Sequence, residues 1–399
     1  MSERQPFAGR LADICAKSSI ALAACLAFAV PFGPSRNTDM QGLLLLIVGG
    51  LAWISLLLKW HGWPLDRPAT ILLGLFFGIG GISSIVNPHL TYDLLGAPHI
   101  RLGYLGLLSC LGFALLLQRT ALLNILRFLY ALILAIALIS LPYVLWHDHS
   151  VTRIGGLFSQ ADIFGVCLAV GLILSSYVHW QTTRRRYTLF VVAQVYLSVL
   201  LILTGTRAAI FLCAILYPVS LRLGSRVSYT KLLLGSGLAV ALLILSQSIL
   251  PGRVTDAHYA TESVSYRIAL HQNALSESTD KPLLGYGPGN IADALDCQHL
   301  TAPALQKTCH QGFFFNSSHN IFLDRVLSAG WLGGVSFLCF VIYALRIGFR
   351  GQPVLRVTAT AALLITLYYL TNVTSVILEL LFWVLLMQCL RPSRASASR

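Results

Sequence analysis

Charged side chains are scarce in this sequence. Only 11% of its 399 residues are Asp, Glu, Lys or Arg, whereas 56% are hydrophobic and the mean hydropathy is +0.74. Soluble domains carry about 25% charged residues, so a domain folded in water could not bury this much apolar surface. Apolar runs of roughly 18 or more residues are typical of membrane-spanning helices. We therefore expect an all-α polytopic membrane protein.

Acidic residues are scarcer than basic ones, with 15 Asp and Glu against 28 Lys and Arg. A formal net charge of +13 can indicate nucleic-acid binding. The basic residues lie instead in short links between apolar runs, and no basic domain with interleaved aromatics is present. We expect no nucleic-acid partner. Residues 1–17 are polar and lack a cleavable signal pattern, so the first apolar run is expected to stay as a helix.

About twelve apolar runs predict spanning helices, with boundaries good to a few residues. The expected spans are 18–33, 41–58, 70–86, 101–117, 121–145, 161–179, 188–204, 207–223, 232–250, 320–345, 353–371 and 375–390. Most Lys and Arg residues, including Arg184, Arg185 and Arg186, fall in one set of links. The opposite short links hold only Arg36, Arg101, Arg153 and Arg207. The positive-inside rule then places both termini in the cytoplasm, and an even number of spans agrees.

Residues 251–319 form one long polar link between the ninth and tenth spans, on the side opposite to the termini. The expected domains are helices 1–9 in 1–250, a periplasmic loop domain in 251–319, and helices 10–12 with a cytoplasmic tail in 320–399. Functional residues concentrate in such loops. Two of the nine cysteines, Cys297 and Cys309, lie in this loop. An oxidising periplasm would allow them to form a disulfide, and two unpaired thiols are the alternative.

Two arginines on the loop side are candidate site residues. Arg207 opens the run 207–223, and a charge at membrane depth is expensive and usually functional. Arg267 borders the apolar stripe of an expected amphipathic helix that could rest on the bundle or on the bilayer surface. For each arginine the alternative is an anchor at the membrane interface. The stripe comprises Val264, Ile268, His271 and Leu275, and Thr261 or Ser263 could cap the helix.

His319 directly precedes the tenth expected span. The positive end of the helix dipole disfavours imidazolium, so the ring should be neutral and able to accept a proton. A residue that only forms hydrogen bonds is the alternative. Asp324 follows five residues later, on a different helical face, and is not expected to orient the imidazole.

Other polar signals are weaker. The Gly-rich stretch 284–289 follows a helix rather than a strand, which indicates a tight turn and not a dinucleotide site. No Asp-x-Asp pair occurs, and the adjacent residues of 147–149 (His-Asp-His) rarely converge on one ion, so we expect no metal. Further polar contacts could come from Asp39, His89, Asp93 and His99. Arginines that bind phosphate and a neutral His that accepts a proton suit metal-free glycosyl transfer from a lipid carrier.

Three motifs resemble those of the O-antigen ligase and polymerase superfamily. Residues 204–209 (TGTRAA) resemble its "TGSR" stretch, and 267–270 (RIAL) with 281–289 (KPLLGYGPG) look like its periplasmic-loop signature. Residues 318–324 (SHNIFLD), continued by 329–333 (AGWLG), are similar to its "HN-x-[YF]-L" helix start. Their order around one long loop makes the match specific.

The resemblance implies a GT-C-like fold in the bacterial inner membrane, with the active site facing the periplasm. It implies that Arg207 and Arg267 contact undecaprenyl pyrophosphate and that His319 activates the acceptor hydroxyl. Tyr266 and Asn320 are further substrate-binding candidates. The implied reaction is a metal-independent, inverting transfer of O-antigen from the lipid carrier to lipid A–core oligosaccharide during lipopolysaccharide synthesis, without a cofactor. One departure is His271, where relatives often carry an aromatic residue.

Other functions stay open. Within the superfamily these are an O-antigen polymerase and a protein O-oligosaccharyltransferase, which usually has a longer periplasmic C-terminal part. A lipid-sugar flippase or other transporter belongs to a different class. Transporters commonly have repeated halves and charges near the membrane midplane, whereas here the charges lie toward one face.

Overall fold

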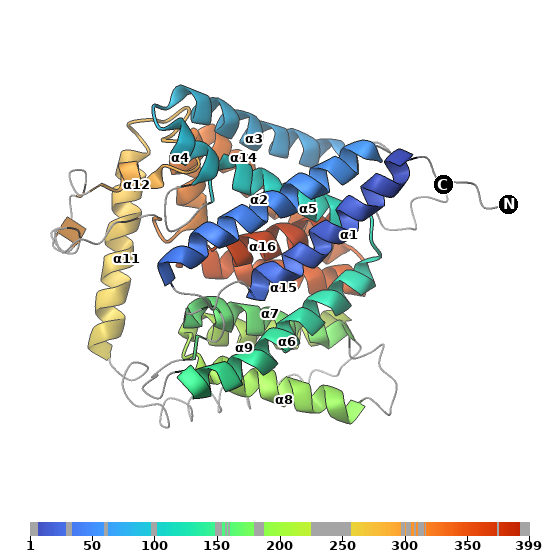
Figure 1. Ribbon diagram of the computed structural model, residues 1–399. Helices are drawn as coiled ribbons and strands as arrows, with labels where there is room; N and C mark the ends of the chain where they lie inside the picture. Colours follow the sequence, from blue (N-terminus) through green and yellow to red (C-terminus); the bar gives the residue numbers. More distant parts are fainter. Residues whose placement is uncertain are drawn as a thin grey trace. The chain divides into compact units, whose positions relative to one another are not determined.

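A computed structural model describes the protein. The described residues are 7–28, 34–59, 63–96, 102–147, 154–155, 158, 160–178, 187–224, 257–296, 300, 305–306, 309, 315, 317–372 and 375–391. The regular elements of this part of the chain are all helices (Figure 1). They are α1 (Phe7–Phe28), α2 (Pro34–Leu58), α3 (Arg67–Val86), α4 (Leu90–Leu95), α5 (Tyr104–Leu117), α6 (Leu122–His147), α7 (Ala161–Val178), α8 (Tyr187–Leu203), α9 (Arg207–Gly224), α11 (Ala257–Glu277), α12 (Ile291–Ala294), α14 (Ile321–Arg350), α15 (Pro353–Tyr369) and α16 (Val376–Cys389).

Each expected span falls on one of these helices except 232–250, which lies outside the described residues. Four stretches are long and apolar enough to cross a membrane: Met40–Leu58, Arg67–Val86, Leu122–Pro142 and Ile321–Arg350. Shorter apolar helices are Tyr104–Leu117, Ala161–Tyr177, Thr188–Leu203, Pro353–Tyr369 and Val376–Cys389. The architecture is therefore consistent with a polytopic membrane protein. The expected number of spans and their orientation stay predictions.

The chain divides into two compact units. The first comprises Met1–Arg119, Thr261–Tyr343 and Tyr369–Met387, and the second Thr120–Ala260, Ala344–Tyr368 and Gln388–Arg399. This division concerns packing within the chain, so the expected topological boundaries at 250 and 319 stay predictions.

In the first unit, α2 packs between α1 and α5 through small residues and side-chain hydrogen bonds. Ser19 donates to the Val48 carbonyl at 2.8 Å, and the Trp53 indole donates to the Leu108 carbonyl at 3.0 Å. A Cβ at Gly49 would lie 2.2 Å from the Ser109 Cβ. Apolar attraction between helices is weak in lipid, and such close approach and polar contacts supply the association there.

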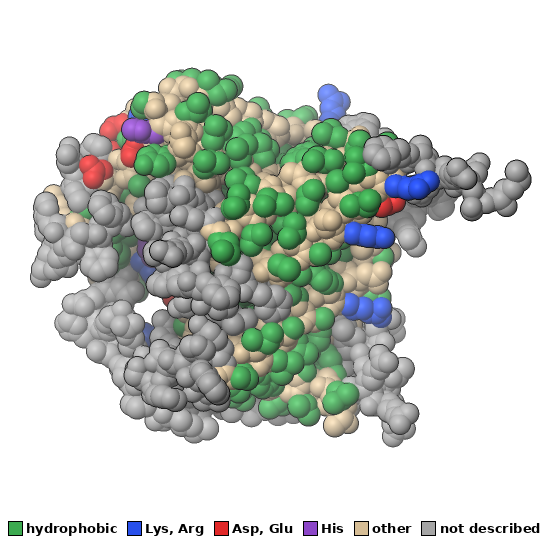
Figure 2. Space-filling model, viewed as in Figure 1, with side chains coloured by type: hydrophobic (Ala, Val, Ile, Leu, Met, Phe, Trp, Pro, Cys, Tyr) green, Lys and Arg blue, Asp and Glu red, His purple; other side chains and the backbone are tan. Residues whose placement is uncertain are grey.

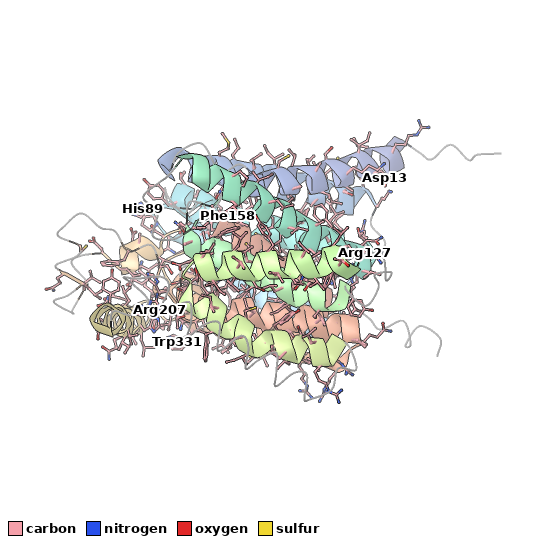
Figure 3. All side chains as sticks on the ribbon, turned by 90° about the horizontal axis from the view of Figure 1, so that it is seen from below. Asp13, His89, Arg127, Phe158, Arg207 and Trp331 are labelled. Atoms are coloured by element: carbon pink, nitrogen blue, oxygen red, sulfur yellow. The ribbon has the colours of Figure 1, made fainter. Side chains whose placement is uncertain are left out.

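The outer surface of these helices is apolar. Figure 2 shows hydrophobic side chains covering the face of α1, α2 and α3 that is turned to the viewer, with His and acidic side chains near α4 and α12. Asp13 and His89 lie at opposite ends of the first unit, and Trp331 lies toward the His89 end (Figure 3). An apolar band with polar groups beyond its ends is the surface that a bilayer requires.

In the second unit, α7 packs against α6, α8 and α9. Gln194 joins three of these helices, because its amide oxygen accepts from Ser175 at 2.8 Å and its NH2 donates to the Tyr130 hydroxyl at 3.2 Å. Arg127 on α6 and Arg207 on α9 lie at opposite ends of this unit (Figure 3).

The tenth expected span is not one continuous helix. Residues Ala329 and Gly330 have non-helical backbone angles and break α14, with φ of 67° at Gly330. The turn that follows α11 docks on this break. The Tyr286 N–H donates to the Leu327 carbonyl at 2.6 Å, and the Trp331 N–H donates to a carbonyl of the turn at 2.8 Å. Backbone groups that the break removes from helical pairing are thus satisfied by the loop.

The loop has a small hydrophobic core of its own, which α11 joins through a face that the sequence analysis did not identify. The inner face of α11 buries Leu270 and Ala274. Their partners include Tyr286, Ile291, Leu295 and Phe315. The expected stripe is exposed, with exposed fractions of 54% at Val264, 51% at Ile268 and 48% at Leu275, so its packing on a bilayer surface stays a prediction. The helix begins at Ala257, so the expected caps at 261 and 263 lie inside it.

Candidate functional site

His319 lies in a tight turn directly before α14 begins at Ile321. Its φ is 61°, a left-handed conformation that costs about 1–2 kcal/mol for a residue with a side chain. Asn320 caps the helix, since its side-chain oxygen accepts from the Phe322 N–H at 3.0 Å and from the Leu323 N–H at 3.3 Å. The helix start that the sequence predicts is therefore present, and the turn fixes the direction of the imidazole.

A buried carboxylate holds this turn. Asp324 accepts from the Ser317 hydroxyl at 2.6 Å. It also accepts from the Ser318 N–H and the Ser318 hydroxyl, each at 2.7 Å. The Ser317 hydroxyl in turn accepts from the His319 N–H at 3.0 Å. Asp324 does not contact the imidazole, as expected, but it positions the backbone that carries it.

The His319 side chain is partly buried and lies near Arg267 and His271. Its Nδ1 is buried without a hydrogen-bond partner among the described residues. Burial lowers the pKa of His319 from 6.5 to about 4, with further lowering by the charges of Arg267 and His271. The imidazole is therefore neutral at neutral pH and can accept a proton.

Arg267 and His271 come to this site from α11. The Arg267 guanidinium donates to the Asn372 side-chain oxygen at 3.4 Å, at the end of α15. The His271 Nε2 is buried and has no partner among the described residues. The Tyr266 ring packs 5.9 Å from the Phe315 ring, in the core of the loop. The first unit thus brings together the predicted residues Arg267 and His319 and adds His271.

Arg207 is the first residue of α9 in the second unit, and its side chain is exposed. The chain reverses at Gly205, whose φ is 61°. The Thr206 N–H donates to the Thr204 hydroxyl at 3.2 Å, and the Thr206 hydroxyl donates to the Ala161 carbonyl at 2.9 Å. The short link expected between the spans 188–204 and 207–223 is therefore a tight turn. A role for Arg207 in a site with His319 is a proposal.

An ion pair inside the first unit escaped the sequence analysis. Arg325 on α14 is hydrogen-bonded to Glu379 on α16, and both side chains are buried. The Trp383 indole also donates to Glu379, at 3.0 Å. The sequence did contain a signal for this pair, because each of two apolar runs holds a charged residue. Charged residues inside apolar spans usually pair with one another. The pair fixes the start of α14 to α16.

Asp93 on α4, expected only to add polar contacts, lies buried beneath the Gly-rich turn. A Cβ at Gly287, whose φ is 101°, would lie 1.9 Å from the Asp93 Oδ1, so only glycine fits there. Burial raises the pKa of Asp93 to about 7. The nearby Gly289 N–H offsets part of this rise, although no hydrogen bond of good geometry reaches the carboxylate among the described residues.

The remaining predictions are tested only in part. Cys309 is disulfide-bonded, but Cys297 lies outside the described residues, so their pairing stays a prediction. In the described part of the chain, no group of three or more His, Cys, Asp or Glu residues could hold a metal ion. Other predicted positions outside the described residues or without a described side chain are Arg36, Asp39, His99, Arg101, 147–149, Arg153 and 184–186.

Fold and site together define a helical membrane protein with a cation-rich polar site beside the ends of apolar helices. Residues 192–338 match the family model described as O-antigen ligase. The matched segment includes Arg207, Arg267 and His319. The match supports membership of the O-antigen ligase and polymerase superfamily, whose members are glycosyltransferase-like enzymes of lipopolysaccharide biosynthesis. No curated protein matches the chain.

Proposed function

We propose that the protein is an O-antigen ligase of the bacterial inner membrane, with both termini in the cytoplasm and the active site facing the periplasm. It transfers O-antigen polysaccharide from undecaprenyl pyrophosphate to lipid A–core oligosaccharide, with inversion and without a metal. The observation that carries this proposal is the neutral imidazole of His319, whose Nδ1 is buried, near the cation of Arg267, within a segment that matches the O-antigen ligase family.

In the proposed reaction, His319 takes the proton of the acceptor hydroxyl. The hydroxyl oxygen attacks the anomeric carbon on the face opposite to the leaving group. The bond from that carbon to the pyrophosphate oxygen breaks, and the lipid pyrophosphate leaves with the electron pair. General-base catalysis of this kind contributes typically 10²–10⁴-fold in rate.

Arginine charge stabilises the departing pyrophosphate. Arg267 gives one N–H to Asn372, and a guanidinium has five donors in a fixed fork, so further N–H groups can face a phosphate. The contact with Asn372 orients the fork, which is the arrangement that bidentate phosphate binding requires. Arg207 is proposed to supply a second guanidinium to the same leaving group.

The test uses the full-length protein in detergent, a lipid-linked O-antigen donor and rough lipopolysaccharide. We expect O-antigen to appear on the lipopolysaccharide, equally with and without EDTA. Elongation of the donor chain instead of transfer to lipopolysaccharide would identify a polymerase. Transfer to an added protein acceptor would identify a protein transferase. A purely transport function predicts no transfer in micelles.

A further inference from the structure

His271 lies one helical turn after Arg267 on α11. Like Arg267, it lies at the border between the buried and the exposed face of this helix. The inner face of the helix is buried in the loop core at Leu270 and Ala274, whereas Ile268 and Leu275 are exposed. The Nε2 of His271 is nevertheless buried, and it has no hydrogen-bond partner among the described residues. Buried polar atoms are nearly always paired, so an unpaired one marks a place that a ligand can complete.

The groups around this atom favour an anion. Arg267 and His271 both lower the pKa of His319 through their charge, and no carboxylate of the described residues is among the causes of that shift. The Nδ1 of His319 is the second buried nitrogen here without a partner among the described residues. The nitrogen-bearing side chains of Arg267, His271 and His319 thus lie near one another. The oxygen that binds Arg267 is the neutral amide oxygen of Asn372.

We propose that His271 is a further ligand-binding residue of this site and that it holds, together with Arg267, the diphosphate of the lipid-linked donor. This inference rests on the proposed function, because the donor is the substrate proposed there. The imidazole donates its Nε2–H to one phosphate group, and Arg267 binds the other.

The spacing of the two residues selects a diphosphate over a monophosphate. Side chains at i and i+4 of a helix have Cβ atoms about 5–6 Å apart. One phosphate group held bidentately by Arg267 occupies the guanidinium fork, and a second, linked phosphate extends toward the next turn, where His271 lies. A lipid monophosphate can bind Arg267 but leaves His271 without a partner. His271 therefore contributes specificity for the number of phosphates.

The test compares binding of two defined probes, a polyprenyl diphosphate and a polyprenyl monophosphate of equal chain length, by the full-length protein in detergent. The His271→Phe variant keeps a ring and removes the hydrogen bond. We expect its Kd for the diphosphate to rise roughly tenfold or more, since a hydrogen bond to a charged group is lost. Its Kd for the monophosphate should change less than twofold. Gln272→Ala, at an exposed neighbouring position on α11, is the matched control.

The His271→Gln variant separates a direct contact from packing, because its amide can still donate. We expect it to recover part of the preference for the diphosphate. Equal loss of affinity for both probes in His271→Phe, or unchanged preference for the diphosphate, would overturn the inference. If the wild-type protein binds both probes and transfers no sugar, the proposed function fails instead. If His271→Phe binds like the wild type while Arg267→Ala does not, only the role of His271 is wrong.

Discussion

Replacing Asp324 with Asn should disable the site without touching any group that contacts the substrate. The Asp324 carboxylate accepts hydrogen bonds from Ser317 and Ser318 and thereby shapes the turn that carries His319. The Asn side chain keeps one acceptor oxygen. It replaces the other oxygen with an NH2 group, which cannot accept from the hydroxyl or N–H that it would face.

The expected magnitude follows from these bonds. A hydrogen bond to a charged group contributes roughly 1.5–3 kcal/mol, and at least one is lost, so the folded turn should be destabilised by at least that amount. His319 holds a left-handed conformation only because its surroundings impose it. Relaxation of that turn moves the imidazole, and a displacement of about 1 Å can lower a rate by roughly 10²-fold.

The assay measures sugar transfer and donor binding on the same preparation. We expect Asp324→Asn to transfer about a hundredfold more slowly while it binds donor nearly as the wild type does, because Arg267 is held separately by Asn372. Ser328→Ala is the matched control, since Ser328 donates to the backbone carbonyl of Asp324 at 2.6 Å and not to its carboxylate. Transfer by Asp324→Asn at the wild-type rate would refute a positioning role for this carboxylate.

Four other predictions concern separate residues. His319→Asn tolerates the left-handed backbone and should fold and bind donor, yet lose roughly two to four decades of rate; retained transfer would exclude a base at this position. Arg267→Lys should lose on the order of 2–4 kcal/mol of transition-state stabilisation, measured as kcat/KM, because an ammonium cannot replace a bidentate fork. The folded pKa of Asp93 is raised from 3.8 to about 7, so the folded state binds the extra proton and stability should fall as the pH rises from about 4 to 7. Asp93→Asn should remove that slope in thermal unfolding, and an unchanged slope would assign it to other groups. Alkylation of the non-reduced, denatured protein should find no free thiol at Cys297 or Cys309, and reaction at both would exclude their bond.

The sequence predicted the parts of the site that one local pattern defines. A few neighbouring residues determine each of these parts: the helix start after His319, the turn before Arg207 and the helix that carries Arg267. The Arg325–Glu379 pair was missed because its members are far apart in the chain. Asp324 was excluded as a partner of the imidazole by helical spacing, which holds only for residues on the helix. Its partners lie in a non-helical turn, where this spacing does not apply.

The second apolar face of α11 was missed for a related reason. The sequence pattern identified the apolar stripe at Val264, Ile268 and Leu275 but not the second face, where Leu270 and Ala274 meet a core built from later parts of the loop. A periodic pattern cannot tell which of two apolar faces is covered when the covering residues are unknown. The break in α14 was hidden because the apolar run continues through Ala329 and Gly330.

The break in α14 also leaves a second part of the helix that is long enough by itself to span a bilayer. Residues 331–350 at 1.5 Å per residue measure about 30 Å, which equals the hydrocarbon thickness of a typical membrane. Trp331 opens this stretch with a partly exposed ring, and Arg346 and Arg350 close it, as suits the two interfaces. The eight helical residues before the break lie outside this stretch. A helix that spans the membrane from Trp331 to Arg350 need not carry Asp324 or Arg325 through the hydrocarbon, and the proposed reaction would then occur near the headgroups, where the lipid anchor of the proposed donor ends and its sugars begin.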